Sequence, residues 1–195
     1  MTLTRRWAVL LLYVAAIYGS LPVGPRYGLR FMRTAPGAWL LGPGLPLLAL
    51  VGAAALLAVL WRRGAPPWAY AALVGAAASY AYTFSWLRTH HLERTHLPEY
   101  GITAWLAWRA LDPLVPGALA GYTAAALLAA AIGYGDELLQ GVLPGRYYDL
   151  RDVALNAAGA VLGIIVLAAV RAGTQRHKAV AVPPSAEIAT PGSGP

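Results

Sequence analysis

The sequence contains no cysteine, so disulfide bonds, thiol catalysis and cysteine-ligated metal sites are all excluded. Acidic residues are also scarce, because the 195 residues include only eight Asp and Glu. Charged residues make up 12% of the chain, against roughly 25% in a typical soluble domain. Hydrophobic residues make up 58%. This balance argues against an ordinary soluble domain and indicates a membrane protein.

The sequence contains long apolar runs without charged residues. Five stretches of 17 or more residues lack Asp, Glu, Lys and Arg, at 7–25, 34–61, 64–87, 113–135 and 153–170. A helix needs about 20 mostly apolar residues to cross a bilayer. We therefore predict an all-α, polytopic helical membrane protein with spans at about 6–22, 38–61, 67–87, 115–140 and 150–171. A Gly- and Pro-rich stretch at 42–46 is expected to distort the start of the second of these spans.

The segment from Pro98 to Leu111 is short for a span, because 14 residues give about 21 Å of helix against a hydrocarbon core of ~30 Å. Pro98 is tolerated in a first helical turn, so the helix could begin nearer Thr95. We predict a short fourth span, which gives about six transmembrane helices in all. Five spans plus a re-entrant segment are the alternative.

Six spans place both termini on the same side of the membrane. That side carries eight Lys and Arg, and the opposite side carries seven. Three of the seven, Arg94, Arg146 and Arg151, lie among carboxylates and are assigned to a polar site, which leaves eight against four. Because Lys and Arg concentrate in cytoplasmic loops, we predict a multi-pass protein of the cell membrane with cytoplasmic termini. The basic residues form small groups at the ends of apolar runs, so no nucleic-acid partner is predicted.

Four of the eight acidic residues lie in DELLQGVLPGRYYDLRD, at 136–152, between two apolar runs. Helical spacing allows Asp136, Glu137 and Gln140 to share a face at the end of the fifth span. An ionised carboxylate at the edge of the hydrocarbon costs a few kcal/mol unless it is paired or hydrated. Arg146 is expected to neutralise Asp149 or Glu137, because arginine makes bidentate contacts with carboxylates.

A stripe of polar and small residues follows along the sixth span. Asp149, Asp152, Asn156, Gly159 and Gly163 are spaced three, four, three and four, which puts them on one helical face. The two glycines allow another helix to approach closely, so the stripe is expected to face the bundle interior. Simpler roles remain open, namely helix capping for the two aspartates and hydration at the interface for the acids of the fifth span.

A further polar set lies in HHLERTHLPEYG, at 90–101. Helical register aligns Glu93, His96 and Tyr100, and six spans put this segment on the same outer side as 136–152. Carboxylates, an imidazole, a phenol, an amide and guanidinium groups would then converge. Such a set could bind a metal, relay protons, perform acid–base chemistry or recognise a polar headgroup. No metal and no cofactor is assigned, and the catalytic residues remain unknown.

Three stretches resemble one known family. DELLQGVLPGRYYDLRDVALNAAGAVLG is similar to the carboxyl-terminal signature of VanZ-like membrane proteins, ERTHLPEYGITAWL resembles the start of their central span, and IYGSLP resembles the end of their first. The resemblance covers about residues 7–170 and implies relation to a protein that confers low-level resistance to a lipoglycopeptide antibiotic. The family's polar positions fall on Glu93, His96, Glu99, Tyr100, Glu137, Gln140, Arg146, Asp149, Asp152 and Asn156.

Together these observations predict a VanZ-like helical membrane domain at 1–171. A tail rich in Pro, Gly and Ala at 172–195 is expected to be disordered. The leading hypothesis is a cell-envelope protein whose outward pocket, formed by the family positions and Asp136, binds or modifies a surface amphiphile such as a lipid or glycolipid headgroup. An intramembrane acid–base enzyme that uses His96, a small transporter and a membrane scaffold are the alternatives.

Overall fold

The computed structural model describes residues 2–87 and 92–181, which form helices and no strand. The long helices are α1 (Leu3–Ser20), α4 (Leu45–Arg62), α5 (Pro67–Trp86), α6 (His96–Leu111), α7 (Ala118–Val142) and α8 (Leu150–Ala181). The short ones are α2 (Gly24–Met32), α3 (Ala35–Trp39), the π-helical turn η1 (Leu40–Gly44) and the 3₁₀ turn η2 (Glu93–Thr95). The predicted all-α class is therefore confirmed.

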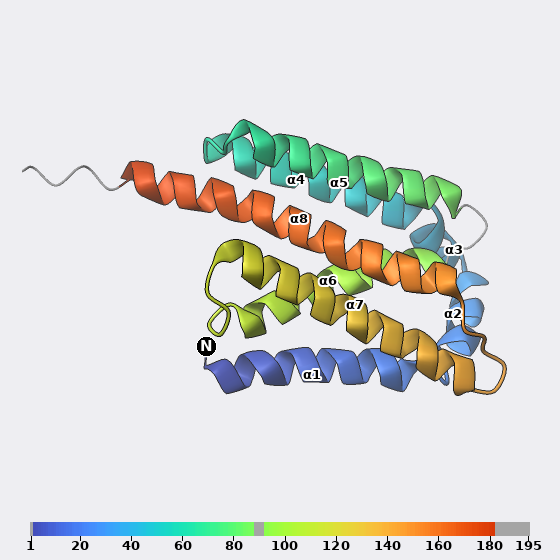
Figure 1. The fold of residues 1–195 in the computed structure, drawn as a ribbon. Helices are drawn as coiled ribbons and strands as arrows, with labels where there is room; N and C mark the ends of the chain where they lie inside the picture. Colours follow the sequence, from blue (N-terminus) through green and yellow to red (C-terminus); the bar gives the residue numbers. More distant parts are fainter. Residues whose placement is uncertain (1, 88–91, 182–195) are drawn as a thin grey trace, which may run out of the picture.

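The long helices lie side by side, and consecutive ones run in opposite directions (Figure 1). The N-terminus and the end of α8 lie at one end of the bundle, and α2, α3 and the α7–α8 link lie at the other (Figure 1). Helix α8 packs against α4, α5, α6 and α7, and α6 also packs against α1 and α7. Helices α6 and α8 therefore form the centre, and the others surround them.

Within the described residues, three helical segments are long and apolar enough to cross a membrane, namely Ala35–Arg62, Ala118–Val142 and Leu150–Gln175. Large apolar side chains also face outward, for example Leu12 at 70% exposure, Leu50 at 66% and Leu127 at 65%. Water would make such surfaces an aggregation hazard, whereas lipid matches them. These features fit the predicted membrane protein, while the count of six spans stays a prediction.

The short helix α6 is stabilised by packing against its neighbours rather than by a long apolar surface of its own. It begins after η2, close to the expected start at Thr95, and Pro98 lies in its first turn. Leu97, Tyr100, Ala104 and Ala107 on this helix are fully buried. Because α6 is enclosed by α1, α7 and α8, it needs less lipid-facing surface than an outer helix does.

The ends of the bundle contain helical residues that the predicted spans do not cover. Between the first two predicted spans, residues Gly24–Met32 form α2, whose Tyr27 and Phe31 are exposed beside arginines. Such an amphipathic helix suits a membrane interface. Helix α8 also continues beyond Arg171 to Ala181, because residues 172–181 contain no proline to end it. The rest of the predicted tail, 182–195, lies outside the described residues.

The predicted distortion of the second apolar run is confirmed, and it occurs where Pro43 and Pro46 interrupt the backbone hydrogen bonds. Residues Leu40–Gly44 form a π-helical turn between α3 and α4, in which the Leu45 N–H donates to the Leu40 carbonyl oxygen. Pro46 has no N–H. The carbonyl groups of Leu41 and Gly42, which the following turn would otherwise bond, are thereby left available for other donors.

At the centre of the bundle, the backbones of α6 and α8 are in direct contact. Its core is mostly alanine, formed by Leu10, Ala104, Leu106, Ala107, Ala110, Ala125, Ala129, Ala160 and Ile164. A Cβ added to Gly163 would lie 2.6 Å from the Gly101 Cα, and one added to Gly159 would lie 2.6 Å from the Leu97 carbonyl oxygen. Helices α6 and α8 therefore approach so closely that these glycines leave no space for a side chain.

We expect Gly163→Ala to lower the free energy of unfolding by about 1–3 kcal/mol, because the added methyl group would push α6 and α8 apart. The matched control is Gly75→Ala in α5, where an added Cβ meets no atom within 4 Å. That change should leave stability unchanged or raise it by up to about 1 kcal/mol, since alanine is the better helix former. Thermal unfolding of the purified proteins in detergent measures both. Equal stability of the two variants would contradict the close helix contact.

Candidate functional site

A cavity of about 370 Å³ lies at the end of the bundle that carries α2 and the α7–α8 link. Seven predicted pocket residues line it, namely Glu93, His96, Glu99, Asp136, Gln140, Arg146 and Asp152. The other lining residues are Ile17, Ser20, Leu21, Gly24, Leu92 and Thr95. Sequence reasoning did not assign these six to the site, although the IYGSLP resemblance had already singled out the end of α1. Helices α1, α2, α6, α7 and α8, together with η2 and the links between helices, thus contribute to one polar cavity.

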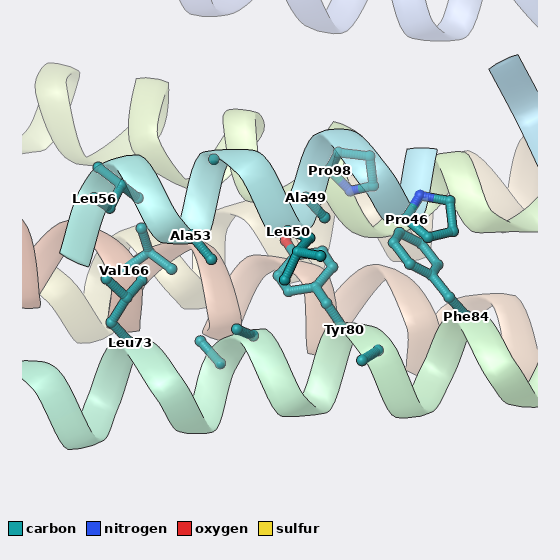
Figure 2. A pocket seen from close by; sticks show the side chains of 14 residues that line it. Pro46, Ala49, Leu50, Ala53, Leu56, Leu73, Tyr80, Phe84, Pro98 and Val166 are labelled. Atoms are coloured by element: carbon teal, nitrogen blue, oxygen red, sulfur yellow. The ribbon is translucent and has the colours of Figure 1, made fainter. Parts of the chain in front are cut away.

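A second cavity, of about 310 Å³, lies between α4, α5 and α8 and is apolar. Figure 2 shows Leu50, Ala53 and Leu56 on α4 opposite Leu73 and Tyr80 on α5. Its lining residues include no Asp, Glu, His, Lys or Arg. The Tyr80 hydroxyl donates a hydrogen bond of 3.4 Å to the Leu97 carbonyl oxygen. This cavity suits hydrocarbon, so the candidate site for chemistry or polar recognition is the first one.

Asp136 lies in α7 with only 1% of its surface exposed. Its Oδ2 accepts a 2.9 Å hydrogen bond from the Tyr100 hydroxyl on α6, and its Oδ1 has no hydrogen-bond partner among the described residues. Gly133, one turn earlier, allows this arrangement, because a Cβ there would lie 2.6 Å from the Asn156 Cβ. The Asn156 amide donates to the Gly133 carbonyl oxygen at 3.1 Å, which fixes α8 against α7.

Glu137 is fully buried and joins the two sides of the α7–α8 link. Its Oε1 accepts from the Gln140 amide at 2.9 Å, and its Oε2 accepts from the backbone N–H of Asp149 at 3.3 Å. Arg146 donates to the Gln140 side-chain oxygen. The expected direct pairing of Arg146 with Asp149 or Glu137 is therefore replaced by a relay through Gln140.

Arg151, which the sequence had assigned to the polar site only as a charge partner, ties η2 to the start of α8. Its guanidinium lies 3.1 Å from Glu93 Oε1 and 3.1 Å from Asp149 Oδ2. Asp149 Oδ1 also accepts from the Arg151 backbone N–H at 2.8 Å. Asp149 thus caps the N-terminus of α8, one of the simpler roles left open above, and takes part in an ion pair as well.

His96 and Asp152 face each other across the cavity. His96 Nε2 lies 4.0 Å from Asp152 Oδ2, and both side chains are 15% exposed. The His96 ring stacks on Tyr100 with 6.4 Å between ring centroids. One potential ligand atom from each of His96, Glu137 and Asp152 lies within 4.8 Å of the other two. The cavity therefore offers an imidazole beside carboxylates, a combination that can move protons or hold a cation.

Arg94 does not pair with the carboxylates, contrary to the expectation from the sequence. It is 6% exposed and donates to the backbone carbonyl oxygens of Gly42 and Phe84 at 3.0 Å, of Leu87 at 3.2 Å and of Leu41 at 3.5 Å. These acceptors are free because Pro46 lacks an N–H and because α5 ends at Trp86. Burial lowers the pKa of Arg94 from its ordinary value, and the carbonyl groups offset the loss of hydration.

We expect a double-mutant cycle on Arg151→Ala and Glu93→Ala to give a coupling energy of about 0.5–1 kcal/mol in detergent thermal unfolding, as for a partly exposed ion pair. The control cycle combines Arg151→Ala with Asp112→Ala, because Asp112 pairs instead with Arg171 at 3.7 Å. This control should be additive within about 0.5 kcal/mol. Additivity in both cycles would show that the Arg151–Glu93 contact does not hold η2 against α8.

The comparisons with known proteins agree with the resemblance seen in the sequence. The profile of the VanZ/LLP1 family matches residues 44–171. Neither the search of curated proteins nor the search of solved structures finds a match. The matched range contains the long helices from α4 to α7, most of α8, and every polar residue predicted for the cavity. The chain belongs to the VanZ/LLP1 family.

Proposed function

We propose that this VanZ/LLP1-family protein is a multi-pass membrane protein whose polar cavity binds the headgroup of a membrane amphiphile, a lipid or a glycolipid. The observation that supports this best is the mixed lining of the cavity. Glu99, Asp136 and Asp152 contribute carboxylates, whereas Ile17 and Leu21 on the α1 side are apolar. A ligand with a polar head and an apolar remainder matches both kinds of surface.

The polar groups of the cavity fit a headgroup that carries hydroxyl or amino groups. Carboxylate and amide oxygens accept hydrogen bonds from such donors, and Arg146 and His96 can donate to a phosphate or a glycosidic oxygen. The volume of about 370 Å³ lies at the lower end of the range for small-ligand sites, which begins near 300 Å³. That size admits a headgroup and excludes a whole lipid.

A second candidate function is modification of the bound amphiphile by acid–base chemistry. The observation in its favour is the His96–Asp152 pair, in which the imidazole lies 4.0 Å from a carboxylate at the cavity wall. A carboxylate can orient an imidazole and stabilise its protonated form during proton transfer. Family membership also suggests a link to lipoglycopeptide susceptibility, as the resemblance in the sequence implied.

We further propose that the cavity opens to the outside and that both termini are cytoplasmic. The basis is the distribution of basic residues. The side with the termini carries eight Lys and Arg, and the opposite side carries four once the three arginines of the polar segments are set aside. Arg94 is buried among carbonyl groups, and Arg146 and Arg151 are hydrogen-bonded to side chains of the site. None of the three is therefore a free loop charge.

We expect purified wild-type protein to retain a defined lipid or glycolipid species in native mass spectrometry. Arg146→Ala and His96→Ala should each reduce its occupancy about tenfold, which corresponds to about 1.4 kcal/mol. Asp112→Asn, on the link at the opposite end of the bundle, is the control and should retain it. Identical lipid profiles in all four proteins would contradict headgroup binding.

A second experiment distinguishes binding from modification. It compares the same lipid or glycolipid species in lipid extracts of deletion and wild-type cells. A changed chemical structure of the amphiphile in the deletion strain indicates modification, and an unchanged structure indicates binding alone. Lipoglycopeptide susceptibility of the same strains tests the link suggested by the family. Expression of His96→Ala in the deletion strain then shows whether that phenotype needs the cavity.

The proposed orientation predicts opposite labelling of two loops. Tyr147, 85% exposed in the α7–α8 link, and Pro116, exposed in the α6–α7 link, lie at opposite ends of the bundle. Because the chain has no native cysteine, Tyr147→Cys should react with a membrane-impermeant maleimide in whole cells, and Pro116→Cys only after lysis. The reverse pattern would invert the orientation, and labelling of both in whole cells would contradict the six-span topology.

A further inference from the structure

Three buried carboxylates lie at the cavity, of which Asp136 and Asp152 belong to its lining and Glu137 lies beside Asp152. Asp136, Glu137 and Asp152 are all largely or fully buried. Among the described residues, no Lys or Arg lies within 4.0 Å of any of the three, and His96 at 4.0 Å from Asp152 is their one ion-pair partner. Buried charges that are not paired are strongly unfavourable, so this site needs a further cation or protons.

The positions of three ligand atoms indicate what kind of cation would fit. One atom each from His96, Glu137 and Asp152 lies within 4.8 Å of the others. The three come from α6, α7 and α8, so the site is formed by three helices that are already packed together. Nitrogen and oxygen donors around a Zn²⁺ ion lie at 2.0–2.2 Å from the metal, and hence roughly 3.4 Å from each other. Small side-chain rotations would close the remaining distance.

Unused donor atoms at the same place provide a second, independent observation. Asp136 lines the cavity, is 1% exposed, and its Oδ1 has no hydrogen-bond partner among the described residues. His96 Nδ1 and Asp152 Oδ1 are buried atoms without partners in the same set. Buried polar atoms are almost always satisfied in native proteins, so several unpartnered ones around one cavity mark a place where water, an ion or a polar ligand binds.

We propose that His96, Glu137 and Asp152 bind a divalent transition-metal ion, with Zn²⁺ as the best match. The imidazole favours such ions over Mg²⁺ and Ca²⁺, which prefer oxygen ligands alone. The metal would balance the carboxylates and leave one coordination position open to the cavity. Three protein ligands with an open position are the pattern of sites that bind an exchangeable water or a ligand oxygen.

Neighbouring contacts already orient two of the three ligands. Gln140 donates to Glu137 Oε1 at 2.9 Å, and the His96 ring stacks on Tyr100. Carboxylate oxygens have two lone pairs each, so Glu137 can keep this hydrogen bond and still bind a metal. Hydrogen bonds to a metal ligand, such as the one from Gln140, usually contribute tenfold or more to metal affinity. Metal binding is independent of the proposed headgroup ligand, because it requires only the purified protein and the ion.

The test measures Zn²⁺ binding to chelator-stripped protein that was purified in detergent without a polyhistidine tag. We expect wild-type protein to bind one Zn²⁺ per chain in isothermal titration calorimetry and metal analysis. His96→Gln and Glu137→Gln, which preserve size, should each weaken binding at least tenfold. The control is His177→Gln, because residue 177 is 25 positions beyond Asp152 along α8, about 37 Å by helical rise.

Co²⁺ serves as a spectroscopic second measurement that does not depend on stability. It should give a visible absorption band typical of a low-coordinate nitrogen and oxygen site in wild type and His177→Gln, and the band should be absent from His96→Gln. No stoichiometric binding by the wild type, or equal binding by all four proteins, would overturn the proposal. Because neither readout includes an amphiphile, failure here leaves the headgroup experiment to be judged by itself.

Discussion

The backbone contact between α6 and α8 is the constraint on which the rest of the structure depends. Gly159 and Gly163 leave room for the α6 backbone at Leu97 and Gly101, so two helices approach without intervening side chains. About two turns from Gly159 towards the start of α8, the same approach places His96 opposite Asp152. A wider separation would take the imidazole out of reach of the carboxylates. Packing deep in the bundle therefore sets the geometry of the polar cavity above it.

Hydrogen bonds within the protein stabilise the buried polar groups, which lipid hydrocarbon could not solvate. Tyr100 satisfies one oxygen of Asp136, and Gln140 with the Asp149 backbone satisfies both oxygens of Glu137. The Tyr100 contact joins α6 to α7 and the Asp149 contact joins the α7–α8 link to α7, so the network also fixes these segments relative to one another. Among the buried atoms that lack a partner in the described part of the chain, His96 Nδ1, Asp136 Oδ1 and Asp152 Oδ1 belong to residues that line one cavity. This grouping makes the cavity the place where a polar ligand would complete the network.

Arg94 shows how an apparent site charge can have a structural role. From its position among acids, the sequence favoured an ion pair. The structure instead places its guanidinium on carbonyl groups that Pro46 and the end of α5 leave without donors. An arginine has five N–H donors, enough to satisfy several such acceptors at once. This contact joins η1, α5 and η2 across the bundle end near the cavity, so it supports the site without lining it.

The sequence by itself determined the helical class, the helices that form from its apolar runs, a distortion at the start of the second run and the family, because these follow from apolar length, proline positions and local motifs. It also indicated that Glu93, His96, Asp136, Gln140 and Asp152 are polar residues at the ends of spans. Only the tertiary structure decided which of them meet. His96, Glu137 and Asp152 come from three helices, and no spacing along one helix encodes the distance between them. The role of α1 in the cavity and the partners of Arg94 and Arg146 were likewise decided by packing between segments far apart in the chain.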